Sequence, residues 1–220
     1  MKVLISRINE RSLSGYLYFN LFENYEVNCL TQEWDITIPE SYPTNLGIYD
    51  VVINCTGITL NQSVEEFSMY DSMKIFETNV IGAMLFTSMY TQDRISTGKQ
   101  GAIIHIGSVG ARKVFTNCSA YCASKAALAH YIMCAAYELK GKINVIGVHP
   151  GGNLIGTKMT QNVQNELITQ RGMTKEQVEK IYADGQSPCS IASFIEALIN
   201  CNLEDMSGEN FYLGKSWKAN

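Results

Sequence analysis

The run Ala102-Ile103-Ile104-His105-Ile106 is apolar at nearly every position and has the length of a β-strand. Comparable runs occur at 3–5, 51–53 and 143–148, weaker ones at 26–30 and 210–213, and segments with helical periodicity lie between them. A strand that is apolar on both faces suits a parallel sheet that helices cover on two sides. The alternation therefore predicts an α/β fold built on a doubly wound parallel sheet.

Local signals mark where several helices begin. Two segments, 63–66 and 174–177, have the pattern of a capping box, in which the first and fourth residues satisfy each other's free backbone amides. Ser187 followed by Pro188 predicts an N-cap with proline in the first turn. The polar stretch 157–186 is expected to cover a site rather than to join two domains.

Composition excludes several classes of protein. The chain has 220 residues, of which 46% are hydrophobic, so it can bury a core, and we expect one domain over residues 1–220. A net charge of −4 without a basic block argues against nucleic-acid binding. Seven scattered cysteines without a CxxC pair predict reduced thiols and no metal site. Because no apolar stretch suits a signal peptide or a membrane span, we expect a cytoplasmic protein without membrane contact.

Three residues with chemical potential follow the central strand. Ser108 stands at its carboxyl end, where open α/β sheets bind their ligands. Tyr121 comes thirteen residues later, and Lys125 four residues after that, so on a helix the phenol and the ammonium share one face. A nearby ammonium favours the phenolate, and this predicts a lowered pKa for Tyr121 that would suit proton transfer.

This arrangement resembles the short-chain dehydrogenase/reductase family. The resemblance covers most of the chain and implies a Rossmann-like fold with Ser108, Tyr121 and Lys125 as catalytic residues. It also implies that Asn79, on the preceding helix, completes the catalytic set.

The same resemblance implies a dinucleotide site at the ends of the strands. The segment Asn54-Cys55-Thr56-Gly57 looks like the family's turn beside the cofactor, with Asn54 and Gly57 in the matching positions. Pro150 and Gly151 match the pair that closes over the nicotinamide, and Thr157 looks like the threonine that contacts its amide. Tyr121 and Lys125 would contact the cofactor as well.

The first turn departs from the family pattern. Ser12, Leu13 and Ser14 stand in place of a Gly-Ile-Gly sequence, and although serine can donate hydrogen bonds to phosphate, its Cβ prevents the closest backbone approach. Arg11 stands where NADP(H)-dependent members often carry a basic residue, with Arg7 nearby. No acid follows the second strand, so NADP(H) is the favoured cofactor and NAD(H) an alternative.

A second departure lies between the second and third strands. Asp35 resembles the family aspartate near the adenine. This predicts a short strand just ahead of Asp35 and a helix that is shortened or absent.

These features support three functional hypotheses. The first is an NADP(H)-dependent oxidoreductase that interconverts a small-molecule carbonyl compound and a secondary alcohol. The second, motivated by the missing glycines, is a catalytically inactive dinucleotide-binding or regulatory module, and the third is an isomerase or dehydratase that uses bound nicotinamide. The resemblance also implies a homodimer or homotetramer joined through the helices that hold Asn79 and Tyr121. His105 and His149 are expected to be structural.

Overall fold

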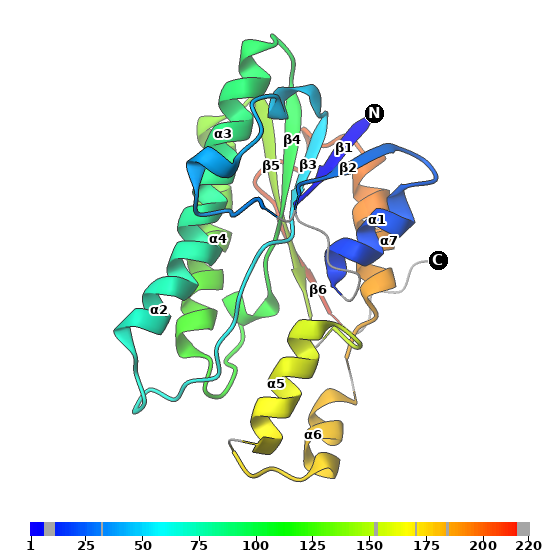
Figure 1. Cartoon of the computed structure of the whole chain (residues 1–220). Coiled ribbons are helices and arrows are strands. Elements are labelled where there is room, and N and C mark those ends of the chain that lie inside the picture. Colours follow the sequence, from blue (N-terminus) through cyan, green and yellow to red (C-terminus); the bar gives the residue numbers. More distant parts are fainter. Residues whose placement is uncertain (7–11, 32, 152–153, 170, 184, 215–220) are drawn as a thin grey trace.

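In the computed structural model, the described residues form a sheet of six strands that run parallel to one another (Figure 1). The order across the sheet is β2-β1-β3-β4-β5-β6. The structure describes residues 1–6, 12–31, 33–151, 154–169, 171–183 and 185–214. The strands are β1 (Lys2–Ile5), β2 (Glu26–Cys29), β3 (Val51–Asn54), β4 (Gly101–Ile106), β5 (Ile143–Pro150) and β6 (Asn210–Leu213).

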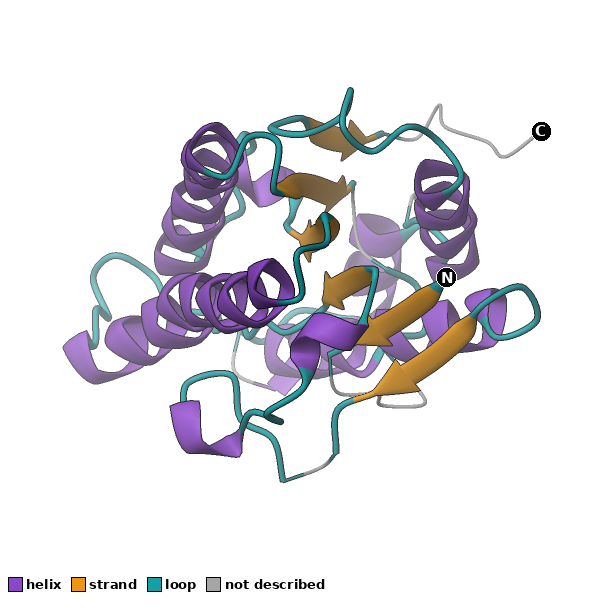
Figure 2. Ribbon diagram, turned by 90° about the horizontal axis from the view of Figure 1, so that it is seen from above, coloured by secondary structure: helices purple, strands orange, loops and turns teal. Residues whose placement is uncertain are grey.

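Helices cover both faces of this sheet, as Figures 1 and 2 show. One face packs against α3 and α4, and the other packs against α1 and α7. Each face has its own apolar core, because the strand residues alternate between the two sides and both sides are buried. The predicted doubly wound fold is therefore confirmed. The helices are α1 (Leu13–Leu21), α2 (Met69–Phe76), α3 (Gly82–Ser96), α4 (Ser119–Glu138), α5 (Lys158–Thr169), α6 (Lys175–Tyr182) and α7 (Pro188–Ile199).

The connection between β2 and β3 was predicted correctly in one respect and wrongly in another. Two short 3₁₀ turns, η1 (Pro39–Ser41) and η2 (Leu46–Ile48), stand where the crossover helix was expected to be shortened or absent. The short strand expected ahead of Asp35 does not form among the described residues. Trp34 instead packs edge-on against Tyr42 and Phe86 in the core. β2 consequently forms the edge of the sheet.

The capping signals gave a mixed result. The box at Thr174 caps α6 with both reciprocal hydrogen bonds, and Ser187 caps α7 with Pro188 in its first turn. The box at Ser63 also forms its hydrogen bonds with Glu66, but only a turn follows. Residues 64–67 are exposed, so a helix there would have no apolar face to bury. α2 begins instead after Ser68, whose hydroxyl accepts from the Asp71 amide.

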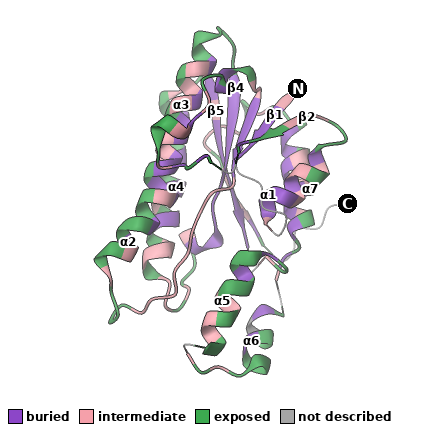
Figure 3. Cartoon of the chain, viewed as in Figure 1, coloured by how far each residue is buried: buried purple, intermediate pink, exposed green. Residues whose placement is uncertain are grey.

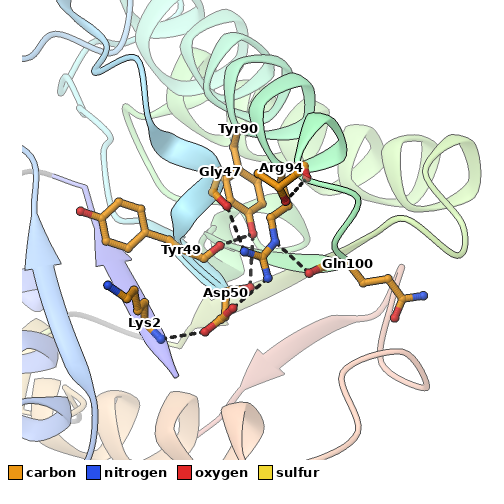
Figure 4. Close-up of polar contacts among 8 residues, drawn as sticks. Lys2, Gly47, Tyr49, Asp50, Tyr90, Arg94 and Gln100 are labelled. Carbon is orange, nitrogen blue, oxygen red and sulfur yellow. Dashed lines mark hydrogen bonds and ion pairs between the residues drawn. The ribbon is translucent and has the colours of Figure 1, made fainter.

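A buried arginine holds the amino-terminal end of the sheet together (Figure 4). The Arg94 side chain, from α3, donates to the carbonyls of Gly47 and Gln100 and pairs with the Asp50 carboxylate at 2.8 Å. Asp50 also accepts from the Lys2 backbone amide at 2.8 Å. Partial burial raises the pKa of the Asp50 carboxyl, yet the Lys2 amide and the Arg94 guanidinium together hold it below its ordinary value. The network joins β1, β3, α3 and the start of β4.

Two helices extend beyond the carboxyl ends of the strands (Figure 1). Most of the surface of α5 and α6 is exposed or half-buried, as Figure 3 shows. Arg171, between them, forms a bidentate pair with Glu66 in the loop between β3 and α2. None of the described helices is long and apolar enough to cross a lipid bilayer.

Candidate active site

Ser108, Tyr121 and Lys125 come together at the carboxyl end of β4. Ser108 is the second residue after β4, with Gly107 between them. It caps the short turn η4 (Val109–Ala111), and its hydroxyl accepts from the Gly110 amide at 3.0 Å. The Ser108 side chain also hydrogen-bonds Tyr121, which lies in the first turn of α4. The Lys125 ammonium lies 5.9 Å from the centre of the Tyr121 ring. The spacing in the sequence thus brings these three groups to one place.

The Lys125 ammonium is buried in the interior of the site. Only 4% of the residue is exposed, and its Nζ donates to the Ile106 carbonyl at 3.3 Å. Burial lowers its pKa to about 8, with the nearby Cys55 thiol acting in the opposite direction. The ammonium therefore stays charged at neutral pH, although at a cost in solvation.

The prediction of an acidified Tyr121 is wrong for the chain by itself. Burial raises the pKa of Tyr121 to about 12, and the hydrogen bond with Ser108 offsets part of that increase. The spacing of Tyr121 and Lys125 along the chain carries no information on desolvation, which is the largest effect on the buried phenol. The phenol is therefore protonated at neutral pH.

Asn79 lies in a π-helical turn, η3 (Glu77–Ile81), between α2 and α3. Such turns insert one residue into a helix and re-aim the side chains beside it. The Asn79 amide accepts from the Ile58 backbone at 2.8 Å and donates to the Ile58 carbonyl and the Ser124 hydroxyl. Ser124 in turn donates to the Tyr121 carbonyl at 2.7 Å. Asn79 thus ties the loop after β3 to the helix that carries Tyr121.

Gly57 makes a close approach to the same groups. A Cβ at this position would lie 3.1 Å from the Lys125 Nζ and 3.3 Å from the Asn79 Oδ1. Any larger residue would push against the ammonium. The turn beside the predicted nicotinamide position is therefore held open by the absence of a side chain.

Asn54 positions that turn. Strand register places Asn54 opposite His105, and its Nδ2 donates to the His105 Nδ1 at 3.2 Å while its Oδ1 accepts from the Thr56 amide. The other ring nitrogen of His105 contacts the Thr87 hydroxyl at 3.0 Å. Burial lowers the pKa of His105 to about 3, so the ring is neutral and structural, as expected.

At the nicotinamide end, the residues fit a dinucleotide. Within the described part of the chain, the Lys125 ammonium donates one hydrogen bond and has three N–H groups, which leaves donors for ribose hydroxyls. Pro150 ends β5, and the Gly151 amide beyond it donates to the Gln186 Oε1 at 2.7 Å.

At the start of α1, part of the turn expected to contact the cofactor phosphates can be placed. Ser12 precedes α1, and its hydroxyl contacts that of Ser14 at 2.7 Å, whereas Leu13 turns into the core. These hydroxyls stand at a helix N-terminus, which favours anions. Arg11 and Arg7 lie outside the described residues.

Two expected cofactor contacts lie apart from this group in local structures of their own. Asp35 closes a turn by accepting from the amide and hydroxyl of Thr37. Thr157 donates to the Leu154 carbonyl and accepts from the Thr160 amide, so it supports the first turn of α5.

The sequence profile described as short chain dehydrogenase matches residues 36–168, which is more than half of the chain. The chain belongs to the short-chain dehydrogenase family. It is 31% identical over 140 residues to an NADP-dependent 3-hydroxy acid dehydrogenase of Schizosaccharomyces pombe, covering 60% of this chain and 54% of that one. It is 32% identical over 130 residues to a 3-oxoacyl-[acyl-carrier-protein] reductase of Bos taurus, covering 59% and 54%.

The likeness to solved structures extends over nearly the whole of this chain. An actinorhodin polyketide ketoreductase solved with NADPH superposes with a TM-score of 0.82 at 16% identity, over 96% of this chain and 95% of that one. The sequence alignments, in contrast, span about half the length of the curated relatives.

Three residues near the site were not identified as functional from the sequence. Gln186 joins the Gly151 amide to the Gly214 carbonyl, and Asn210 contacts the His149 ring at 2.7 Å. Their partners lie far away along the chain, so no local pattern marks them. For His149, the one available signal was its position directly before Pro150.

Proposed function

We propose that this chain is an NADP(H)-dependent oxidoreductase that interconverts a carbonyl group and a secondary alcohol. The observation that carries the proposal is the buried group formed by the Ser108 hydroxyl, the Tyr121 phenol and the Lys125 ammonium. A phenol that remains protonated beside a fixed cation can give a proton to a carbonyl oxygen as it is reduced.

Each residue has a distinct part in this scheme. The nicotinamide, when bound, supplies or accepts the hydride. Ser108 would donate a hydrogen bond to the substrate oxygen, and Tyr121 would deliver the proton to that oxygen. The Lys125 charge would stabilise the phenolate that remains and hold the ribose. Asn79 would keep the Ile58 backbone and α4 in register, and we assign it the anchoring of a water relay.

The preference for NADP(H) over NAD(H) belongs to the proposal. A relative named NADP-dependent and a similar fold solved with NADPH support it. The relatives from Schizosaccharomyces pombe and Bos taurus are named for 3-hydroxy acids and 3-oxoacyl groups. These compounds, free or as acyl thioesters, are therefore the first substrates to examine. A panel of these compounds with both cofactors should show turnover with NADP(H).

Replacing Tyr121 with phenylalanine should lower kcat by about a thousandfold while leaving the fold and NADPH affinity intact. The change removes the proton donor but keeps the ring that packs in the site. Steady-state kinetics, circular dichroism and calorimetric titration with NADPH measure the three properties. Tyr70→Phe, at an exposed position of α2, is the matched control and should behave like the wild type.

The inactive-module hypothesis gains support from the serines that replace glycines before α1. Under this hypothesis the wild type turns over no substrate of the panel, whether or not it binds NADPH.

For the oxidoreductase proposal, a Tyr121→Phe variant that keeps most of the wild-type activity would refute the role assigned to the phenol.

We also propose a homodimer or homotetramer joined through α3 and α4. Ile81 ends η3 directly ahead of α3, Met133 and Tyr137 lie on α4, and they have 57%, 52% and 85% of their surfaces exposed. Large apolar side chains exposed on these helices suit a two-fold interface. Light scattering should give a multimeric wild type and a smaller species for Met133→Asp. The control Phe19→Asp, on α1 at the opposite face, should keep the wild-type mass, and a monomeric wild type would contradict the proposal.

A further inference from the structure

His149 is a buried histidine that the proposed chemistry does not use. It is the residue before Pro150 in β5, and none of its surface is exposed. Its ring lies between the Ser108 backbone on one side and Asn210 of β6 on the other. The strand register pairs His149 with Tyr212 of the same strand β6.

The hydrogen bonds define the state of the ring. The Asn210 amide nitrogen donates to the Ala129 carbonyl at 3.1 Å, so its Oδ1 faces the His149 Nε2 at 2.7 Å. An amide oxygen only accepts, and Nε2 must therefore carry the proton. Burial lowers the pKa of His149, so the ring is neutral at pH 7 and Nδ1 has a free lone pair.

That lone pair faces the active-site serine. The Ser108 backbone N–H donates to the His149 Nδ1 at 3.1 Å. Nδ1 also lies 3.3 Å from the Ser108 carbonyl, a contact that only a ring protonated at Nδ1 could use as a donor. In the neutral ring, His149 accepts from Ser108, and this fixes the backbone at the residue that holds the substrate oxygen.

Packing keeps the ring in this orientation. The Tyr212 ring stacks on it with centres 4.3 Å apart. The guanidinium of Arg112, the residue after η4, lies 3.8 Å from the centre of the Tyr212 ring. On the remaining side, a Cβ at Gly107 would lie 2.1 Å from the His149 Nδ1. Glycine before Ser108 therefore makes room for the histidine.

We propose that His149 is a positioning residue that holds the Ser108 backbone through Nδ1, with Asn210 selecting the tautomer. The proposal rests on the proposed oxidoreductase function for its kinetic consequence. Its geometric content, the tautomer and the acceptor role of Nδ1, stands independently of turnover. It assigns β6 a part in the active site that the catalytic residues alone do not reveal.

The kinetic test compares two replacements of His149. His149→Phe keeps a ring against Tyr212 but leaves the Ser108 N–H without its acceptor, and kcat should fall by about 100-fold, with NADPH affinity unchanged. His149→Asn restores an acceptor oxygen near the position of Nδ1 and should recover at least about tenfold of that loss. His130→Phe, on the exposed surface of α4, is the control and should leave kcat unchanged.

A spectroscopic test uses the wild-type protein and needs no folded Phe variant. Nitrogen NMR of histidine-labelled protein, with the His149 signals identified by their loss in His149→Asn, should show a neutral ring protonated at Nε2 at pH 7. A charged ring, or one protonated at Nδ1, would overturn the proposal. So would a His149→Phe variant with wild-type kcat. A wild type without any turnover would instead contradict the oxidoreductase function and leave the NMR result to decide the geometry.

Discussion

Lys125→Met is expected to abolish turnover and, at the same time, to stabilise the fold by about 3 kcal/mol at pH 7. The activity is lost because the phenolate of Tyr121 would form without its neighbouring cation. Stability rises because a buried ammonium, 4% exposed, is replaced by an apolar chain of similar length. A functional residue that weakens the fold in this way fits the trade-off between activity and stability.

The pH dependence of this effect has a definite sign. The pKa of Lys125 falls from 10.5 to about 8 on folding, so the unfolded chain binds more protons between these values. Below pH 8 both states are charged and the full penalty applies. As the pH rises from 8 to 10.5, this penalty disappears, so the contribution of Lys125 makes the wild type more stable at pH 10.5 than at pH 8.

Urea unfolding at pH 7 and at pH 10 measures both parts of the prediction. The advantage of Lys125→Met should be large at pH 7 and small at pH 10. Lys113→Met, an exposed lysine in the neighbouring loop, is the control and should show no such pH-dependent gain. A Lys125→Met variant that is less stable than the wild type at pH 7 would show that the ammonium contributes more through its contacts than it loses through burial.

Arg94→Met is expected to destabilise the fold by about 3 kcal/mol with little effect on the kinetics of the molecules that remain folded. Arg94 is 4% exposed, and its loss leaves the Gly47 and Gln100 carbonyls without their donor and the Asp50 carboxylate without its cation. A buried group that loses its partner costs about 1–3 kcal/mol, and this applies to the Gly47 carbonyl, whereas the Asp50 carboxylate is 41% exposed and contributes less. Because the network lies at the opposite end of the strands from Ser108, the site should keep its geometry.

Arg171→Met provides a sharp control for this prediction. Arg171 also pairs with a carboxylate through two nitrogens, and that pair lowers the pKa of Glu66 to about 2. The Arg171 side chain is 25% exposed, however, against 5% for Arg94, so water can replace its lost contact with Glu66 and the urea midpoint should change little. Equal losses of stability in the two variants would show that burial does not determine the contribution of these arginines.

The seven cysteines are unpaired in the structure. Cys55, beside Lys125, has a pKa raised by burial to about 12, although the ammonium acts against this increase. It is therefore a neutral packing residue in the wall of the site.

The sequence by itself determined the order of the strands along the chain and the residues that meet at the end of β4. Both depend on short-range regularities, since apolar runs mark buried strands and a spacing of four places Tyr121 and Lys125 on one helical face. The tertiary structure alone decided the charge states and the remote supports. The phenol is less acidic than its lysine neighbour suggested, because desolvation depends on everything that covers it. His149 and Asn210 meet because β5 and β6 are adjacent in the sheet, and no pattern along the chain encodes a pairing across 61 residues.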